Sequence, residues 1–145
     1  EWEYACRGGT TSLYFHGDNP EGLAKIGNVA DGTLKARFDM FVTIKAKDGF
    51  PFTAPVGNFR PNSFGLFDTH GNVWEWCSDW FSQSYHVHSS NHNPVGPAKG
   101  QGRVIKGGSY MCHASYCNRY RMGARTSTTP DSSAGHHGFR CAGDV

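Results

Sequence analysis

The sequence lacks the features that mark a membrane protein or a nucleic-acid-binding protein. It contains no apolar run of about eighteen residues, which is the minimum for a membrane-spanning helix. Its formal net charge is only +2, and its 14 Lys and Arg residues are dispersed along the chain. A nucleic-acid interface would gather basic residues into a patch or stripe. We therefore expect neither a membrane nor a nucleic acid as a partner.

Long periodic segments are also scarce. The 145 residues include 19 glycines and 7 prolines, a composition that predicts many loops and short elements within one domain. Residues 1–9 predict the end of a helix, because Gly8 and Gly9 accept the left-handed conformation that stops a helix. We expect strands at residues 103–106, 119–125 and 138–141, and a short buried strand beginning at residues 64–67.

The 5 cysteines do not form the two closely spaced pairs that a structural zinc site commonly uses. Cys112 and Cys117 are five positions apart. On a helix this step turns the second side chain about 140° from the first, and on a strand an odd step points it to the opposite face. The two sulfurs can cooperate only if the backbone between them bends.

Three interpretations of this pair stay open from the residues alone. The pair forms a disulfide across a small loop, or two unrelated buried thiols. It belongs to a zinc site with His113, although further ligands are missing. Or it binds a soft ion such as Cu(I), or acts as a redox dithiol. Two thiolates suffice for Cu(I), so the last interpretation requires no further ligand.

Motifs along nearly the whole chain resemble one family. They are GGSYMCHASYCNRYR at residues 107–121, TPDSS at 129–133, GFRC at 138–141, NVWEW at 72–76 and EWEYACRGG at 1–9. Together they are similar to the formylglycine-generating enzymes, or sulfatase-modifying factors, and the cysteine pair with TPDSS is the most specific part. Relatives normally have a sizeable region before this point. We expect residues 1–145 to be a single domain of this type that lacks the family's N-terminal region.

The resemblance implies an α+β domain of the C-type-lectin-like sulfatase-modifying-factor fold, with a small twisted antiparallel sheet, few helices and much irregular structure. It implies an oxidase that uses Cu(I) and O₂ to convert a cysteine in a Cys-x-Pro-x-Arg segment of an unfolded sulfatase polypeptide to Cα-formylglycine. Cys112 and Cys117 would hold the copper, Ser109 and Tyr116 would line the oxygen pocket, and Trp74 would wall it. The alternative is a non-catalytic protein- or ligand-binding module on the same scaffold.

The resemblance also implies two structural Ca²⁺ sites. The first would use the side chains of Asn28 and Asp48 with the carbonyls of Val29 and Phe50, and the second the side chains of Asp68 and Glu75 with the carbonyls of Gly71 and Val73. From the residues alone, ordinary Asx turns explain Asn28 and Asp48. Glu75 is different, because a carboxylate between two tryptophans needs a partner or a cation.

The remaining cysteines bear on the compartment. The resemblance implies a disulfide between Cys6 and Cys141, with free thiols as the alternative in a reducing cytosol. Cys77 would be a buried free thiol, and Met122 replaces a cysteine that forms a second disulfide in some relatives. Bacterial family members are cytoplasmic and animal ones lie in the endoplasmic reticulum or are secreted. The compartment stays open, and the GNVWEWC motif favours a bacterial source.

Overall fold

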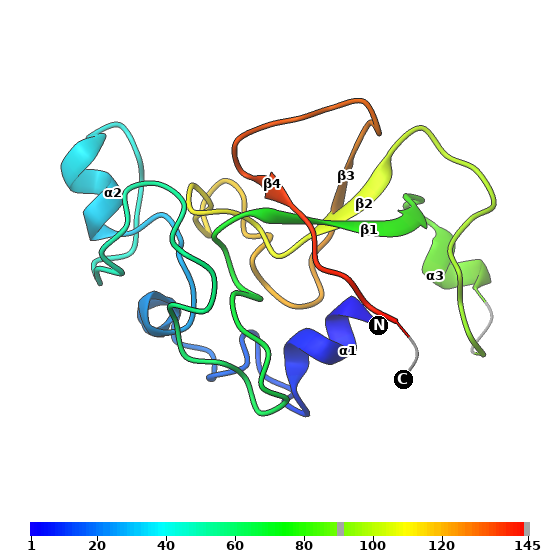
Figure 1. Ribbon diagram of the computed structural model, residues 1–145, viewed down its shortest axis with the longest axis horizontal. Helices are drawn as coiled ribbons and strands as arrows, with labels where there is room; N and C mark the ends of the chain where they lie inside the picture. Colours follow the sequence, from blue (N-terminus) through cyan, green and yellow to red (C-terminus); the bar gives the residue numbers. More distant parts are fainter. Residues whose placement is uncertain (90–91, 144–145) are drawn as a thin grey trace.

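The computed structural model describes residues 1–89 and 92–143, and most of this chain is irregular (Figure 1). Its helices are α1 (Trp2–Arg7), the 3₁₀ helix η1 (Pro20–Lys25), α2 (Gly32–Arg37) and α3 (Tyr85–His88); its strands are β1 (Trp74–Trp80), β2 (Arg103–Lys106), β3 (Thr126–Thr128) and β4 (His137–Gly138). The expected α+β class is confirmed. The helix stop is confirmed too, since Gly8 caps α1 in the left-handed conformation with φ 55°.

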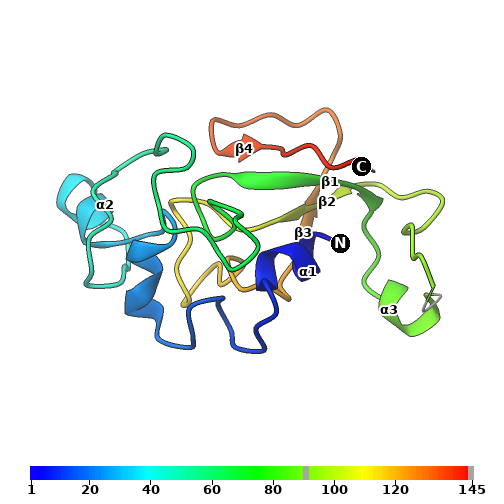
Figure 2. The ribbon, with the colours of Figure 1, turned by 60° about the horizontal axis from the view of Figure 1, so that its bottom comes forward.

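A four-stranded sheet with strand order β3-β2-β1-β4 forms the platform of the domain. β2 pairs antiparallel with both β1 and β3, whereas β4 runs parallel to β1 with Trp74 opposite His137. The sheet is therefore mixed rather than wholly antiparallel. Figure 2 shows β4 on one side of β1 and helix α1 below the sheet.

Three of the four expected strands differ in position or do not form. The strand at residues 103–106 is confirmed as β2. The strand expected at residues 119–125 does not form, and β3 begins only after it, at Thr126. The strand expected at residues 138–141 is reduced to β4 at His137–Gly138. The strand expected at residues 64–67 was wrong, and both Phe64 (49 % exposed) and Phe67 (38 % exposed) lie outside the core.

Three irregular segments meet where the sheet ends, at residues 27–30, 70–72 and 107–112. Asn72 donates its backbone N–H to the Asn28 carbonyl at 2.6 Å, and Ala30 donates to the Cys112 carbonyl at 3.0 Å. This contact needs glycine, because a Cβ on Gly27 would lie 1.8 Å from the His70 carbonyl oxygen. The backbone around Cys112 is therefore fixed by segments distant in sequence.

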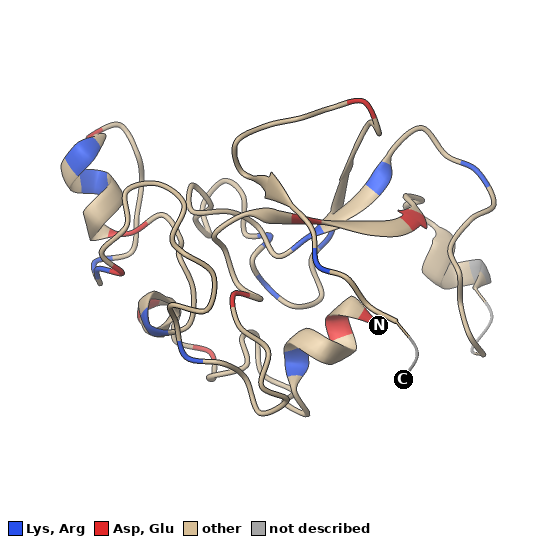
Figure 3. Ribbon diagram, in the orientation of Figure 1, with Lys and Arg blue, Asp and Glu red and all other residues tan. Residues whose placement is uncertain are grey.

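Charged residues are spread over the domain, as Figure 3 shows, so the dispersed charge expected from the sequence is confirmed. Where the structure describes the chain, it contains no helix with the length and apolar character needed to cross a membrane.

Candidate functional site

Cys112 and Cys117 are joined by a disulfide, with their Cα atoms 5.2 Å apart. The backbone between them is bent and irregular, as the five-residue spacing predicts. The carbonyl of His113 accepts backbone N–H groups from Tyr116 (3.3 Å), Cys117 (3.0 Å) and Asn118 (2.9 Å). Asn118 adopts a φ of 50°, a left-handed conformation that asparagine tolerates better than most residues. This tight turn holds the two sulfurs together.

The loop that carries Cys112 leaves strand β2 through two glycines. Gly107 has φ 85° and Gly108 has φ 72°, and a Cβ on Gly108 would lie 2.9 Å from the backbone nitrogen of Tyr120. Only glycine meets both conditions without strain. The chain therefore reverses directly after β2 and brings Ser109 and Cys112 against the sheet.

The other expected site residues lie around the pair. The Ser109 hydroxyl is buried, 3.9 Å from the Cys112 sulfur, and accepts the Met111 N–H at 3.4 Å. Tyr116 is 49 % exposed and donates its hydroxyl hydrogen to the Met111 carbonyl at 2.7 Å. Trp74 belongs to the same hydrophobic cluster as Cys112. Their expected roles in copper and oxygen chemistry stay predictions.

The two sulfurs differ in access. Cys112 is only 3 % exposed, whereas Cys117 is half-buried at the edge of the core. A ligand from solvent would reach the pair from the Cys117 side.

The disulfide must first be reduced, since thiolates and not a disulfide bind soft metals. The donor set then fits Cu(I), because two adjacent thiolates are soft ligands. A structural zinc site is disfavoured, since the described residues contain no group of three or more candidate His, Cys, Asp or Glu ligands.

The residues expected at the first Ca²⁺ site do come together. Asn28 is fully buried, and its Oδ1 has no hydrogen-bond partner. Asp48 accepts the backbone N–H groups of Val29 (3.1 Å) and Phe50 (2.8 Å). Burial, helped by the nearby carboxylate of Asp31, raises the pKa of Asp48 to about 7 against the opposing effect of those hydrogen bonds. The half-buried carboxylate of Asp48 and the buried one of Asp31, near an unpaired oxygen, fit a hard cation. Calcium here stays a prediction, and Asp31, another oxygen donor of the same irregular region, accepts the backbone N–H of Asp48.

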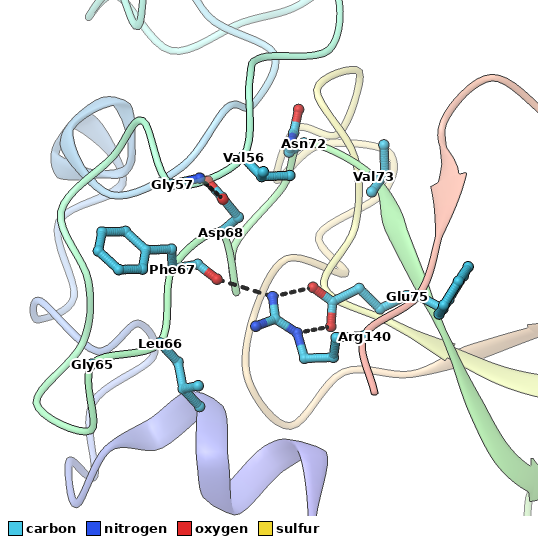
Figure 4. A pocket seen from close by; sticks show the side chains of 11 residues that line it. Val56, Gly57, Gly65, Leu66, Phe67, Asp68, Asn72, Val73, Glu75 and Arg140 are labelled. Carbon is cyan, nitrogen blue, oxygen red and sulfur yellow. Dashed lines mark hydrogen bonds and ion pairs between the residues drawn. The ribbon is translucent and has the colours of Figure 1, made fainter. Parts of the chain in front are cut away.

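The second expected Ca²⁺ site differs from the expectation. Asp68, Val73 and Glu75 line one cavity of about 420 Å³ (Figure 4), and Asp68 Oδ1 is buried without a partner. Both Glu75 oxygens, however, bind the Arg140 guanidinium, through Nε at 2.7 Å and Nη2 at 2.5 Å. Trp2 Nε1 also donates to Glu75, at 2.5 Å. Arg140 therefore balances the charge of Glu75 without a metal, and a Ca²⁺ ion at Asp68 stays a prediction.

The disulfide expected between Cys6 and Cys141 is not formed in the structure, where both are free thiols. Cys6 is buried and its thiol points to the Thr69 carbonyl at 3.5 Å, while Cys141 is exposed. Burial raises the pKa of Cys6 to about 11. Cys77 is free as expected, but it is half-buried rather than buried.

A supporting residue that sequence reasoning missed is His70, which is fully buried behind the cysteine loop. Its Nδ1 lies 2.6 Å from the Tyr120 carbonyl, and its Nε2 lies 3.3 Å from the Phe15 backbone nitrogen. A carbonyl must accept and an N–H must donate, so these partners define a neutral imidazole protonated on Nδ1. Lone histidines carry no periodic signal that would have revealed this role.

These features define a class: a small α+β domain with a cysteine pair on a bent loop behind an inner strand. The Sulfatase-modifying factor enzyme 1-like domain matches residues 1–145, and the chain belongs to this family. The formylglycine-generating enzyme of Streptomyces coelicolor is 53 % identical over 146 residues, which cover 100 % of this chain and 45 % of the relative. The formylglycine-generating enzyme of Mus musculus is 49 % identical over 144 residues, covering 99 % and 37 %. The chain thus spans less than half the length of these curated relatives.

A solved structure supports the fold. Treponema denticola variable protein 1 superposes with a TM-score of 0.75 at 31 % identity, covering 96 % of this chain and 43 % of that chain. The expected sulfatase-modifying-factor fold is therefore confirmed.

Proposed function

We propose that this domain takes part in sulfatase activation as an oxidase that converts a cysteine in a Cys-x-Pro-x-Arg segment to Cα-formylglycine. One observation carries the proposal: the Cys112 and Cys117 sulfurs are held together on a bent loop, with Cys112 buried and Cys117 only half-buried. The names of the close relatives in two distant organisms support the same activity.

The residues of the loop have distinct tasks in this proposal. Reduced Cys112 and Cys117 supply two thiolates, and the target peptide approaches Cys117 because Cys112 is covered. When bound between them, Cu(I) would supply a position for the target sulfur and for reduction of O₂. Ser109 accepts the Met111 N–H, and its own hydroxyl hydrogen faces the Cys112 sulfur at 3.9 Å, where it can donate toward the reacting atoms. Buried Trp74 limits the access of water.

Tyr116 requires a rearrangement. Its hydroxyl hydrogen is held by the Met111 carbonyl at 2.7 Å, so it donates to a reduced oxygen species only after this bond opens. The overall reaction joins the target thiol, O₂ and two reducing equivalents to give the aldehyde, hydrogen sulfide and water. The two reducing equivalents must come from an added reductant.

The test uses the reduced chain loaded with Cu(I), a Cys-x-Pro-x-Arg peptide, air and a reductant, with mass spectrometry of the peptide. We expect loss of the thiol and gain of an aldehyde, and no change in a matched peptide with serine at the target position. A folded, copper-loaded chain that leaves the cysteine peptide unchanged would refute the oxidase and favour the binding module.

A further inference from the structure

A cluster of apolar and aromatic side chains lies at the surface between helix α2 and the cysteine loop. We define the aromatic surface by the linked rings of Phe38, Phe41, Phe52 and Tyr110, together with the exposed Met40 and Val42 of the same segment as Phe38 and Phe41. Met40 is 84 % exposed, Val42 55 % and Phe52 50 %. Ring contacts join the aromatic members, since the Phe38 ring lies 5.8 Å from Phe52 and 6.3 Å from Phe41. Contiguous exposed apolar patches on a folded domain commonly mark interaction sites.

The aromatic surface is physically continuous with the candidate site. The Tyr116 hydroxyl, which donates to the Met111 carbonyl, lies only 3.4 Å from the Val42 carbonyl oxygen. Ile44 donates to the Ala30 carbonyl at 3.0 Å, and Ala30 donates to the Cys112 carbonyl. The Phe52 ring lies 6.4 Å from that of Tyr110, two positions before Cys112. A chain lying across Cys117 and Tyr116 would therefore meet this surface next.

The rim of the aromatic surface is basic. Residues 35–47 contain the exposed basic residues Lys35, Arg37, Lys45 and Lys47 and a single acidic residue, Asp39, which pairs with Lys35 at 3.2 Å. Figure 3 shows the basic residues along α2. The Glu21 carboxylate binds the backbone N–H groups of residues 45 and 46 and offsets part of this charge. The rim stays net positive, which complements an acidic partner.

We propose that the aromatic surface binds a flank of the target polypeptide outside the Cys-x-Pro-x-Arg motif, and that it selects a flank with an aromatic side chain beside a carboxylate. This inference rests on the proposed function for the identity of the polypeptide. The aromatic side chain would pack on Phe52 and Met40, and the carboxylate would lie beside Lys45 and Lys47. Target choice would then depend on residues beyond the five that react.

The test measures binding without chemistry. Fluorescent peptides carry the motif with serine in place of the target cysteine, and a Phe-Glu or a Ser-Lys pair on either side. Fluorescence anisotropy with the metal-free chain should give about tenfold tighter binding for Phe-Glu on one side, a gain that burial of one aromatic ring readily supplies. The double variant Met40→Ser/Val42→Ser should remove the gain, and Lys45→Glu/Lys47→Glu should reduce it.

The control is Val95→Ser, which removes an equally exposed apolar side chain (83 % exposed) from the segment after α3 and should leave the gain intact. If the Phe-Glu and Ser-Lys peptides bound with equal affinity, whichever side of the motif carried the pair, the inference would be overturned. So would a dimer, seen by light scattering, that Met40→Ser/Val42→Ser converts to monomer, because the surface would then bind a second copy.

Conversion of a motif-only peptide is measured separately. A flank effect without conversion supports the surface and refutes the oxidase, and the converse outcome refutes only the surface.

Discussion

At the scale of the residue, His70 shows how one buried side chain sets a pH dependence. Burial lowers its pKa to about 4, although the bond to the Tyr120 carbonyl favours the charged form. A second proton would place an N–H on Nε2, facing the donor N–H of Phe15. The neutral ring is therefore required for the folded packing behind the cysteine loop.

Stability should accordingly fall as the pH falls. An unfolded histidine titrates near 6.5, so between pH 6.5 and 4 the unfolded state binds more protons than the folded state. The titration of His70 should therefore lower the free energy of unfolding by about 3 kcal/mol at pH 4, relative to neutral pH. Asp48 acts in the opposite direction, because its raised pKa makes the folded state take up protons below pH 7. The measurement is therefore the difference between the unmodified chain and His70→Asn in urea unfolding at pH 7 and pH 4.5. The exposed His86→Asn serves as the control, and equal pH slopes for the chain and His70→Asn would contradict this assignment.

Cys117 gives a second test at this scale. Cys117→Ser should weaken Cu(I) binding at least ~100-fold, ~2.8 kcal/mol, because one soft thiolate is lost from a pair. Its half-buried position should leave the far-ultraviolet circular dichroism unchanged. Copper affinity is measured by competition with a Cu(I) chelator under anaerobic, reduced conditions, and Cys77→Ser is the matched control. If Cys117→Ser bound Cu(I) as tightly as Cys77→Ser does, the assignment of the copper site to Cys112 and Cys117 would be wrong.

The residues of the cysteine loop could be predicted from the sequence because they are local: Ser109, Cys112, Tyr116 and Cys117 lie within one bent segment. The partner of Glu75 could not, since Arg140 is 65 positions away and only β4, running parallel to β1, brings it there. The sequence indicated that Glu75 needs a partner or a cation, but not which residue of the chain is the partner.

At the scale of the element, side-chain hydrogen bonds explain why two expected strands are absent. The Oδ1 of Asn62 accepts the N–H groups of Phe64 and Leu66, so this segment turns instead of pairing. The buried ammonium of Lys106 donates hydrogen bonds to the carbonyls of Met122 and Ala124. A strand at residues 119–125 would need these carbonyls as acceptors for a neighbouring strand. The pattern of apolar residues carries no information about such side-chain hydrogen bonds. Strand β2, in contrast, could be predicted from its own four residues.

The turn after β2 should be intolerant of a side chain. Gly108→Ala combines a left-handed φ of 72° with a contact to the Tyr120 nitrogen, and we expect a loss of about 3 kcal/mol in unfolding free energy. Gly135→Ala, where a Cβ meets nothing within 4 Å, should change stability by less than about 0.5 kcal/mol. Urea unfolding measures both. Equal stability of the two variants would show that the turn is more adaptable than its geometry indicates.

At the scale of the whole molecule, the long irregular half of the chain is held by backbone contacts between distant segments rather than by helices and strands. Asn28 lies at one such contact and carries an unpaired buried oxygen. A cation that binds there would tie residues 28–50 to the sheet and stabilise the whole domain.

Calcium should therefore raise the melting temperature. At a Ca²⁺ concentration 100 times the dissociation constant the gain is about 2.7 kcal/mol, and excess chelator should reverse it. Asp48→Asn should abolish the gain, whereas exposed Asp39→Asn should keep it. Differential scanning calorimetry with Ca²⁺, with chelator and with Mg²⁺ measures the effect. A melting temperature that is independent of Ca²⁺ would reject the first calcium site.

The single carboxylate of Glu75 receives Trp2 from one end of the chain and Arg140 from the other, and this has a consequence for biosynthesis. During translation Trp2 and Glu75 leave the ribosome long before Arg140 does. Until residue 140 clears the exit tunnel, the nascent domain carries an uncompensated negative charge at its centre. Folding around Glu75 is therefore expected to wait until residue 140 has left the ribosome, and a nascent chain that stops before this residue should stay open and be recognised by chaperones and proteases.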